Sequence, residues 1–226
     1  MADFRTEYQK IYETLRAAIM SGEYVPGERL PQRRLAQRYG TTTITVREAL
    51  RFLEQDGLIA IEPKWGAMVA EITPERIRGR YVVREALEGM AARLVASTIT
   101  EAERPALVEL AERCDRELVA VGLSRQQKAA LHYALHELIV RTTRCRELVE
   151  SITRTNLQTV LMSNAYHIDW EHDDPHRHRT LVQSLLSGDP DQAEATMRAH
   201  VRDGCAMELA ALEKGQGWPP ELREPR

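Results

Sequence analysis

The chain has 226 residues, a formal net charge of −3 and 29% charged residues. This length allows two domains of ordinary size, and the hydrophobic fraction of 43% indicates a folded globular protein. No apolar run approaches the ~20 residues needed to cross a bilayer, and the polar N-terminus does not resemble a signal peptide. The three cysteines are widely spaced and lack a CxxC pair, which argues against a disulfide framework or a thiolate zinc site and favours a reducing cytoplasm.

The first predicted helix begins at Thr6, which has capping-box spacing to Gln9, and ends at Gly22. A Pro26-Gly27 turn follows. A shorter helical pattern, PQRRLAQRYG, then ends at Gly40. Between Gly40 and Gly57 the apolar residues recur at i, i+3, i+4 and i+7, as on one face of a helix: Val46, Ala49, Leu50 and Leu53. Two short helices joined by three or four residues predict a helix-turn-helix.

After Gly57, the runs LIAIE and AMVAEI predict two short strands, and PKWG between them has turn chemistry. A hairpin at this position makes the unit a winged helix, with Lys64 and Trp65 at the wing tip. Lys64 there either contacts the DNA backbone or simply keeps the turn soluble.

The exposed face of the second short helix offers groups that can reach base edges or phosphates, which predicts a recognition helix: Thr42, Thr43, Thr45 and Arg47. Between residues 28 and 51, six arginines face only Glu28 and Glu48. Such a patch either supplies phosphate contacts or solvates the helix surfaces. Arg47 itself either contacts DNA or pairs with a neighbouring carboxylate.

From Thr73-Pro74 onward the chain has helical periodicity and no strand pattern. The predicted helices span residues 74–97, 101–121, 125–142, 145–164, 174–187 and 190–213. The expected fold is therefore mainly α, with a winged helix over residues 1–72, an antiparallel bundle of about six helices over 73–213, and a loose tail over 214–226.

All seven histidines lie between positions 132 and 200. His132 and His136 are four residues apart and share one helix face, whereas His178 and His200 belong to two later helices. A bundle can bring such side chains to one point in its core, where neutral imidazoles suit Zn²⁺, and also Ni²⁺, Co²⁺ or Fe²⁺. The alternative is that these histidines lie on the surface or line a pocket without metal.

Residues 11–70 resemble the N-terminal domain of the GntR family of bacterial transcription regulators. The matching residues are Gly22, Pro26-Gly27, Leu30, Leu35-Ala36, Gly40, Val46 to Leu50, Leu53, Gly57-Leu58 and Gly66. The resemblance implies operator contacts by Arg33, Thr42, Thr45, Arg47 and Gly66. The chain has Thr43 where the family usually has arginine, and Thr45 where proline is common. These departures put the usual operator sequence in doubt and leave the docking mode intact.

Residues 80–204 resemble the all-helical ligand-binding domain of the FadR subfamily, the FCD domain. The matching residues are Arg84, Leu87-Glu88, His136, His178, Gly188-Asp189, Ala193, Met197 and His200. Many members bind a divalent metal through an aspartate, a histidine four residues later, and two further histidines. The resemblance therefore implies a metal site, with zinc as the first candidate before Ni, Co, Fe or Mn. His132 stands at the aspartate position, where it either replaces the carboxylate as a ligand or points away so that water completes the shell.

In relatives the metal helps to hold a small organic acid whose carboxylate also meets an arginine. Arg84 falls at that position, and its guanidinium fork suits a carboxylate. The alternative is that Arg84 pairs with Glu88, one turn further along its helix.

The sequence thus predicts a ligand-responsive repressor that binds a palindromic operator as a homodimer and acts in the cytoplasm. A metal-dependent hydrolase is disfavoured because HYALH lacks the glutamate of HExxH and of HxxEH. A metal-free regulator of the acyl-coenzyme A type is a further alternative, as is a winged helix that binds protein rather than DNA.

Overall fold

A computed structural model describes residues 6–165, 168 and 174–214. Side chains are described for the same residues except 157–165. The chain divides into two compact units, of which one ends at Ile72 and the other begins at Thr73. The expected loose tail over 214–226 falls almost entirely outside the described residues.

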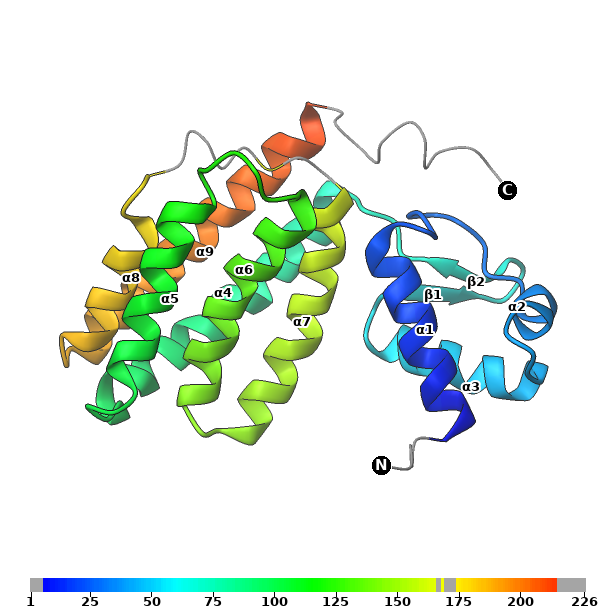
Figure 1. Ribbon diagram of the computed structural model, residues 1–226, viewed down its shortest axis with the longest axis horizontal. Coiled ribbons are helices and arrows are strands. Elements are labelled where there is room, and N and C mark those ends of the chain that lie inside the picture. The colour runs from blue at the N-terminus through cyan, green and yellow to red at the C-terminus, as the bar shows by residue number, and fades with distance from the viewer. Residues whose placement is uncertain (1–5, 166–167, 169–173, 215–226) are drawn as a thin grey trace. The chain divides into compact units, whose positions relative to one another are not determined.

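The first unit is a winged helix. Its helices are α1 (Glu7–Ser21), α2 (Gln32–Arg38) and α3 (Thr43–Gln55), followed by the antiparallel strands β1 (Ile59–Glu62) and β2 (Gly66–Val69) (Figure 1). The α1 start has the predicted capping box between Thr6 and Gln9, and Gly22 ends the helix in the left-handed region.

The core of this unit is made by the apolar faces that the periodicity predicts. The buried side chains include Leu15, Ile19, Leu30, Leu50, Leu53 and Leu58. The strand-like segment around Arg29 extends the hairpin, since Leu30 N donates to Ala67 O at 2.8 Å and Val69 N donates to Glu28 O at 2.9 Å. The wing is therefore anchored to the chain that leads into α2.

The second unit consists, within the described residues from Thr73 onward, of six helices (Figure 1). They are α4 (Pro74–Thr98), α5 (Arg104–Glu117), α6 (Arg125–Thr142), α7 (Arg146–Ala165), α8 (Arg177–Leu186) and α9 (Pro190–Glu213). The predicted helix 101–121 is shorter than expected at both ends: residues 101–103 form turns, and residues 118–122 form turns and a bend. The fold class predicted from the sequence is confirmed.

Helix α4 is the organising element of this bundle: it lies along α9 and also contacts α6, α7 and α8. Apolar residues from α4, α6 and α7 form a buried cluster that includes Ala91, Val140, Leu148 and Ile152. Helices α4 and α6, together with α5, α8 and α9, also carry buried polar residues, and these make up the candidate site. Of the helices in the described part of the chain, none is long and apolar enough to cross a membrane.

Candidate functional site

The recognition helix α3 begins at Thr42, whose hydroxyl accepts a hydrogen bond from Thr45 N at 3.2 Å. The Thr42 and Thr45 hydroxyls also lie 2.9 Å apart. Thr42 therefore caps the helix and, together with Thr45, presents a fixed pair of hydroxyl groups. Thr43 lines a hollow of about 430 Å³ that Arg33, Gln37 and Thr41 also border.

Two arginines of the basic patch form ion pairs with glutamates of the same unit. Arg38 pairs with Glu23, and Arg51 Nη1 lies 3.2 Å from Glu48 Oε1. Neither Arg33 nor Arg47 has an ion pair within the described residues, and both are exposed. Within the described residues, Arg47 therefore does not form the salt bridge that was the alternative to a DNA contact.

The wing tip holds Lys64 and Gly66, both exposed, in a turn where Gly66 adopts a φ of 76°. The Arg29 guanidinium lies 4.4 Å from the centroid of the Trp65 ring, within the range of a cation–π contact. Sequence reasoning did not find this pair, and it also missed Ile44, which is 69% exposed on α3. An apolar side chain there suits contact with a thymine methyl group.

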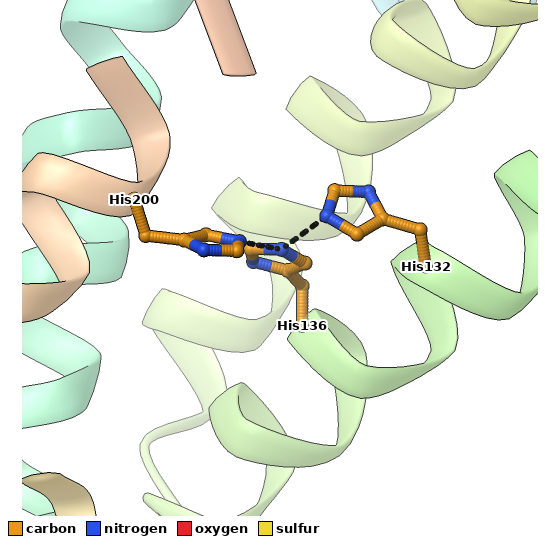
Figure 2. Close-up of side chains that lie close together, drawn as sticks. All are labelled: His132, His136 and His200. Atoms are coloured by element: carbon orange, nitrogen blue, oxygen red, sulfur yellow. Dashed lines mark hydrogen bonds between the residues drawn. The ribbon is translucent and has the colours of Figure 1, made fainter. Parts of the chain in front are cut away.

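In the helical unit, three of the four predicted metal ligands come together. Figure 2 shows His132 and His136 rising from α6 toward His200 on α9. His136 Nε2 lies 3.1 Å from His132 Nε2 and 3.2 Å from His200 Nε2. All three side chains are buried, and one ligand atom from each lies within 4.8 Å of the others.

His178 lies beside this set rather than within it. Its ring centroid is 5.3 Å from those of His132 and His200, and the ring is buried. His178 Nδ1 lies 2.9 Å from Asp115 Oδ1, while its buried Nε2 has no hydrogen-bond partner among the residues that the structure describes. Leaving a buried nitrogen without a hydrogen-bond partner costs free energy. A metal bound to His178 Nε2 would remove that cost.

The outer nitrogens of two histidines are held by carboxylates. His136 Nδ1 lies 2.5 Å from Glu88 Oε2, and Asp115 holds His178 in the same way. A carboxylate on Nδ1 fixes the proton there and leaves the Nε2 lone pair for a metal. Sequence spacing gave no sign of Asp115, because it lies 63 residues from His178.

Arg84 is 2% exposed, and its Nε donates to Glu88 Oε1 at 2.6 Å. The structure thus contains the Arg84–Glu88 pair that was the alternative to an effector contact. Burial alone would raise the pKa of Glu88, but Arg84 and His136 outweigh it and hold that pKa at about 2. Glu88 is therefore an ionised carboxylate that joins Arg84 to the histidine cluster.

Burial lowers the pKa of His132, His136 and His200 below the ordinary histidine value. The folded chain therefore keeps these rings neutral in a pH range where the unfolded chain takes up protons. These rings therefore make the free energy of unfolding increase as the pH rises to about 6.5, and decrease as the pH drops below that value.

We expect urea unfolding of the metal-free protein to give a smaller free energy of unfolding at pH 5.5 than at pH 7.5. A His132→Leu variant should lose part of this dependence, because it removes one buried ring that resists protonation. The exposed His176 offers a matched control, and His176→Leu should keep the wild-type slope. Equal stability of the wild type at both pH values would contradict the expectation.

Both units of the chain match known protein families. Residues 7–69 match the gntR family of bacterial regulatory proteins, and residues 80–203 match the FCD domain. The chain belongs to the GntR family: it is a DNA-binding transcriptional regulator with an N-terminal helix-turn-helix domain and a C-terminal FCD domain. This confirms the prediction of a regulator rather than an enzyme.

Relatives from Bacillus subtilis and Escherichia coli span nearly the whole chain. The HTH-type transcriptional regulator YdhC of Bacillus subtilis is 25% identical over 96% of this chain and 99% of its own. The HTH-type transcriptional repressor RspR of Escherichia coli is 26% identical over 93% and 92%. A GntR regulator from Rhodococcus shares the fold with a TM-score of 0.70, at 22% identity over 90% of this chain and 98% of its own.

Proposed function

We propose that this regulator is a metal-containing repressor of the FadR subfamily that senses a small organic acid. The observation that carries the proposal is the spacing of the imidazole nitrogens. Two ligands of a tetrahedral zinc ion lie about 3.3 Å apart when each bond is ~2.05 Å long. The Nε2 atoms of His132 and His200 lie 3.1 and 3.2 Å from that of His136, close to this edge length.

His178 is the proposed fourth ligand, supported by its unpartnered Nε2 and by the carboxylate on its Nδ1. An all-imidazole set suits zinc, with Ni²⁺, Co²⁺, Fe²⁺ or Mn²⁺ as other candidates. A bound divalent cation would supply the positive charge that attracts a carboxylate effector. The convergence of three buried imidazoles on one point favours the metal-containing alternative over a pocket for an acyl-coenzyme A.

Arg84 is the proposed second partner of the effector carboxylate. Among the hydrogen bonds of the described residues, Glu88 takes only the Nε donor of Arg84. The guanidinium carbon lies 4.7 Å from the Tyr81 ring centroid and 5.3 Å from that of Tyr133. The Nη donors therefore remain for an anion, while Glu88 keeps the guanidinium in place.

Repression is supported by a relative that is named a repressor, and a homodimer by the one winged helix that the described residues of a chain contain. Two recognition helices related by a two-fold axis would read two half-sites of a palindrome. Such a protein would work in the cytoplasm, where its operator is. The effector would change operator affinity by binding one of two domain arrangements more tightly than the other.

Replacing Arg47 by alanine tests the recognition helix. An operator is first selected from random duplex DNA, and its affinity is measured by fluorescence anisotropy. We expect Arg47→Ala to weaken binding about 10- to 100-fold, because a lost arginine contact costs about 1–3 kcal/mol. Arg51→Ala is the matched control on the same helix, since Arg51 already pairs with Glu48. Wild-type affinity in Arg47→Ala would show that the recognition-helix assignment is wrong.

The sensing function is tested with the same DNA. Zinc-loaded and metal-free protein are titrated with the selected operator in the presence of single small carboxylates from a panel. We expect at least one acid to shift operator affinity in the zinc-loaded protein and to leave the metal-free protein unchanged. A shift of equal size in both preparations would separate sensing from the metal, and a response to acyl-coenzyme A alone would favour the metal-free alternative.

A further inference from the structure

His200 is held differently from His136 and His178, whose outer nitrogens meet carboxylates. His200 Nδ1 accepts a hydrogen bond from Arg177 Nε at 3.1 Å, rather than donating to a carboxylate. Arg177 is the first residue of α8, and its Nη2 also donates to the His200 carbonyl oxygen at 2.8 Å. Its Nη1 lies 3.0 Å from Met207 Sδ. A half-buried guanidinium is thus clamped onto the helix turn that carries a proposed metal ligand.

The position of the ring proton follows from these contacts. A neutral imidazole carries one N–H, and Arg177 Nε, a permanent donor, uses the lone pair of His200 Nδ1. The His200 proton therefore lies on Nε2, the nitrogen that faces His136 Nε2 at 3.2 Å. His136 has the opposite arrangement, because Glu88 holds its proton on Nδ1. His136 Nε2 thus presents a lone pair that can bind a cation, whereas His200 Nε2 carries a proton and cannot.

We propose that Arg177 gates the metal site: its hydrogen bond to His200 Nδ1 and a metal bound to His200 exclude each other. This inference rests on the proposed metal site. If the metal binds Nε2, the ring proton moves to Nδ1, where it meets the Arg177 N–H. If the ring turns so that Nδ1 binds the metal, the metal takes the lone pair that Arg177 uses. Either way the Arg177 Nε bond is lost, and His200 keeps one proton and no charge.

The gate has a measurable cost. Metal binding must offset a charge-assisted hydrogen bond, so the metal-free state is favoured and the apparent metal affinity is lowered. Glu88 and Asp115 act in the opposite sense, because each holds a proton away from the nitrogen that would bind metal. Arg177 is therefore a positioning residue whose removal should tighten metal binding, whereas removal of an ordinary supporting group weakens it.

The test compares zinc affinities of metal-free, full-length variants by competition with a chromogenic chelator. Arg177→Met keeps an unbranched side chain for packing and removes the donor, and we expect it to bind zinc about tenfold more tightly than wild type. Arg202→Met is the matched control: it removes an equal charge from an exposed position two residues from His200, where Arg202 bonds Glu85 at 2.6 Å. Its affinity should stay within about twofold of wild type. An unchanged or weaker affinity in Arg177→Met would overturn the proposal.

The wild-type chain provides a second readout that needs no variant. Long-range ¹H–¹⁵N spectra of the histidine rings should place the His200 proton on Nε2 in the metal-free protein, and zinc should shift the Arg177 Nε–H signal. A His200 ring already protonated on Nδ1 without metal, or an Arg177 signal unmoved by zinc, would also overturn the gate. A wild type that takes up no zinc at all would instead refute the proposed metal site, even where the His200 proton is found on Nε2.

Discussion

Replacing Glu88 by glutamine is expected to lower the free energy of unfolding by about 3–5 kcal/mol, the cost of removing one partner of a buried ion pair. Glu88 is fully buried and its two oxygens serve Arg84 and His136, at 2.6 and 2.5 Å. Glutamine has nearly the same shape but no charge, so the guanidinium of Arg84 would remain buried without a counter-ion. Urea unfolding of the metal-free protein at pH 7 measures the loss.

The matched control for this variant is Glu85→Gln on the same helix. Glu85 Oε1 accepts from Arg202 Nη2 at 2.6 Å, but Arg202 is mostly exposed, so this pair is screened by solvent. Its removal should cost less than about 1 kcal/mol. If Glu88→Gln were as stable as Glu85→Gln, the buried pair would not be a stabilising centre of the bundle, and its role in holding His136 would need another explanation.

Replacing His136 by alanine is expected to weaken zinc binding at least about hundredfold. Structural zinc sites bind with about 10–16 kcal/mol, which for four ligands is roughly 3 kcal/mol each. His136 is the central ligand, because its Nε2 lies next to those of both His132 and His200. Competition with a chelator of known affinity measures the change.

The control for this experiment is His176→Ala. His176 is exposed next to α8, where its ring contacts Arg179, so its loss should leave zinc affinity unchanged. Unfolding curves of both variants separate a loss of zinc affinity from a loss of folding. If the two alanine variants bound zinc equally well, His136 would not be a ligand and the cluster would be an ordinary buried polar network.

The fold could be predicted largely because its signals are local. The capping box of Thr6 and the cap at Thr42 depend on neighbours three residues away, and the buried face of α3 follows from periodicity alone. Helix ends were less certain where no such signal exists, as around residues 101–103, which adopt a turn. Local hydrogen bonds and side-chain period therefore account for the elements, whereas their exact ends depend on packing.

The site could be predicted only in part. The spacing of His132 and His136 placed both on one face of α6, and the pairing of Arg84 with Glu88 was available as an i, i+4 contact. The groups that set the ring protons could not be found in this way. Asp115 and Arg177 reach the histidines from 63 and 23 residues away, respectively. Only tertiary packing brings them there, so no spacing in the sequence marks them.

The surface that would meet DNA could also be predicted only in part. Thr42, Thr45 and Arg47 follow from the helical wheel of α3, and the structure leaves Arg47 exposed. The contact of Arg29 with Trp65 depends on the pairing of the Arg29 segment with β2, which the sequence pattern did not reveal. Side chains brought together by strand pairing are therefore the part of this surface that needed a structure.

The metal content of the purified chain tests the central claim most directly. Untagged protein is prepared without chelator, and elemental analysis gives the equivalents of each divalent metal per chain. The account predicts about one equivalent, with zinc favoured, and its loss in a His136→Ala variant that still folds. Protein that binds its operator but contains no metal, and takes up none when zinc is supplied, would contradict the account.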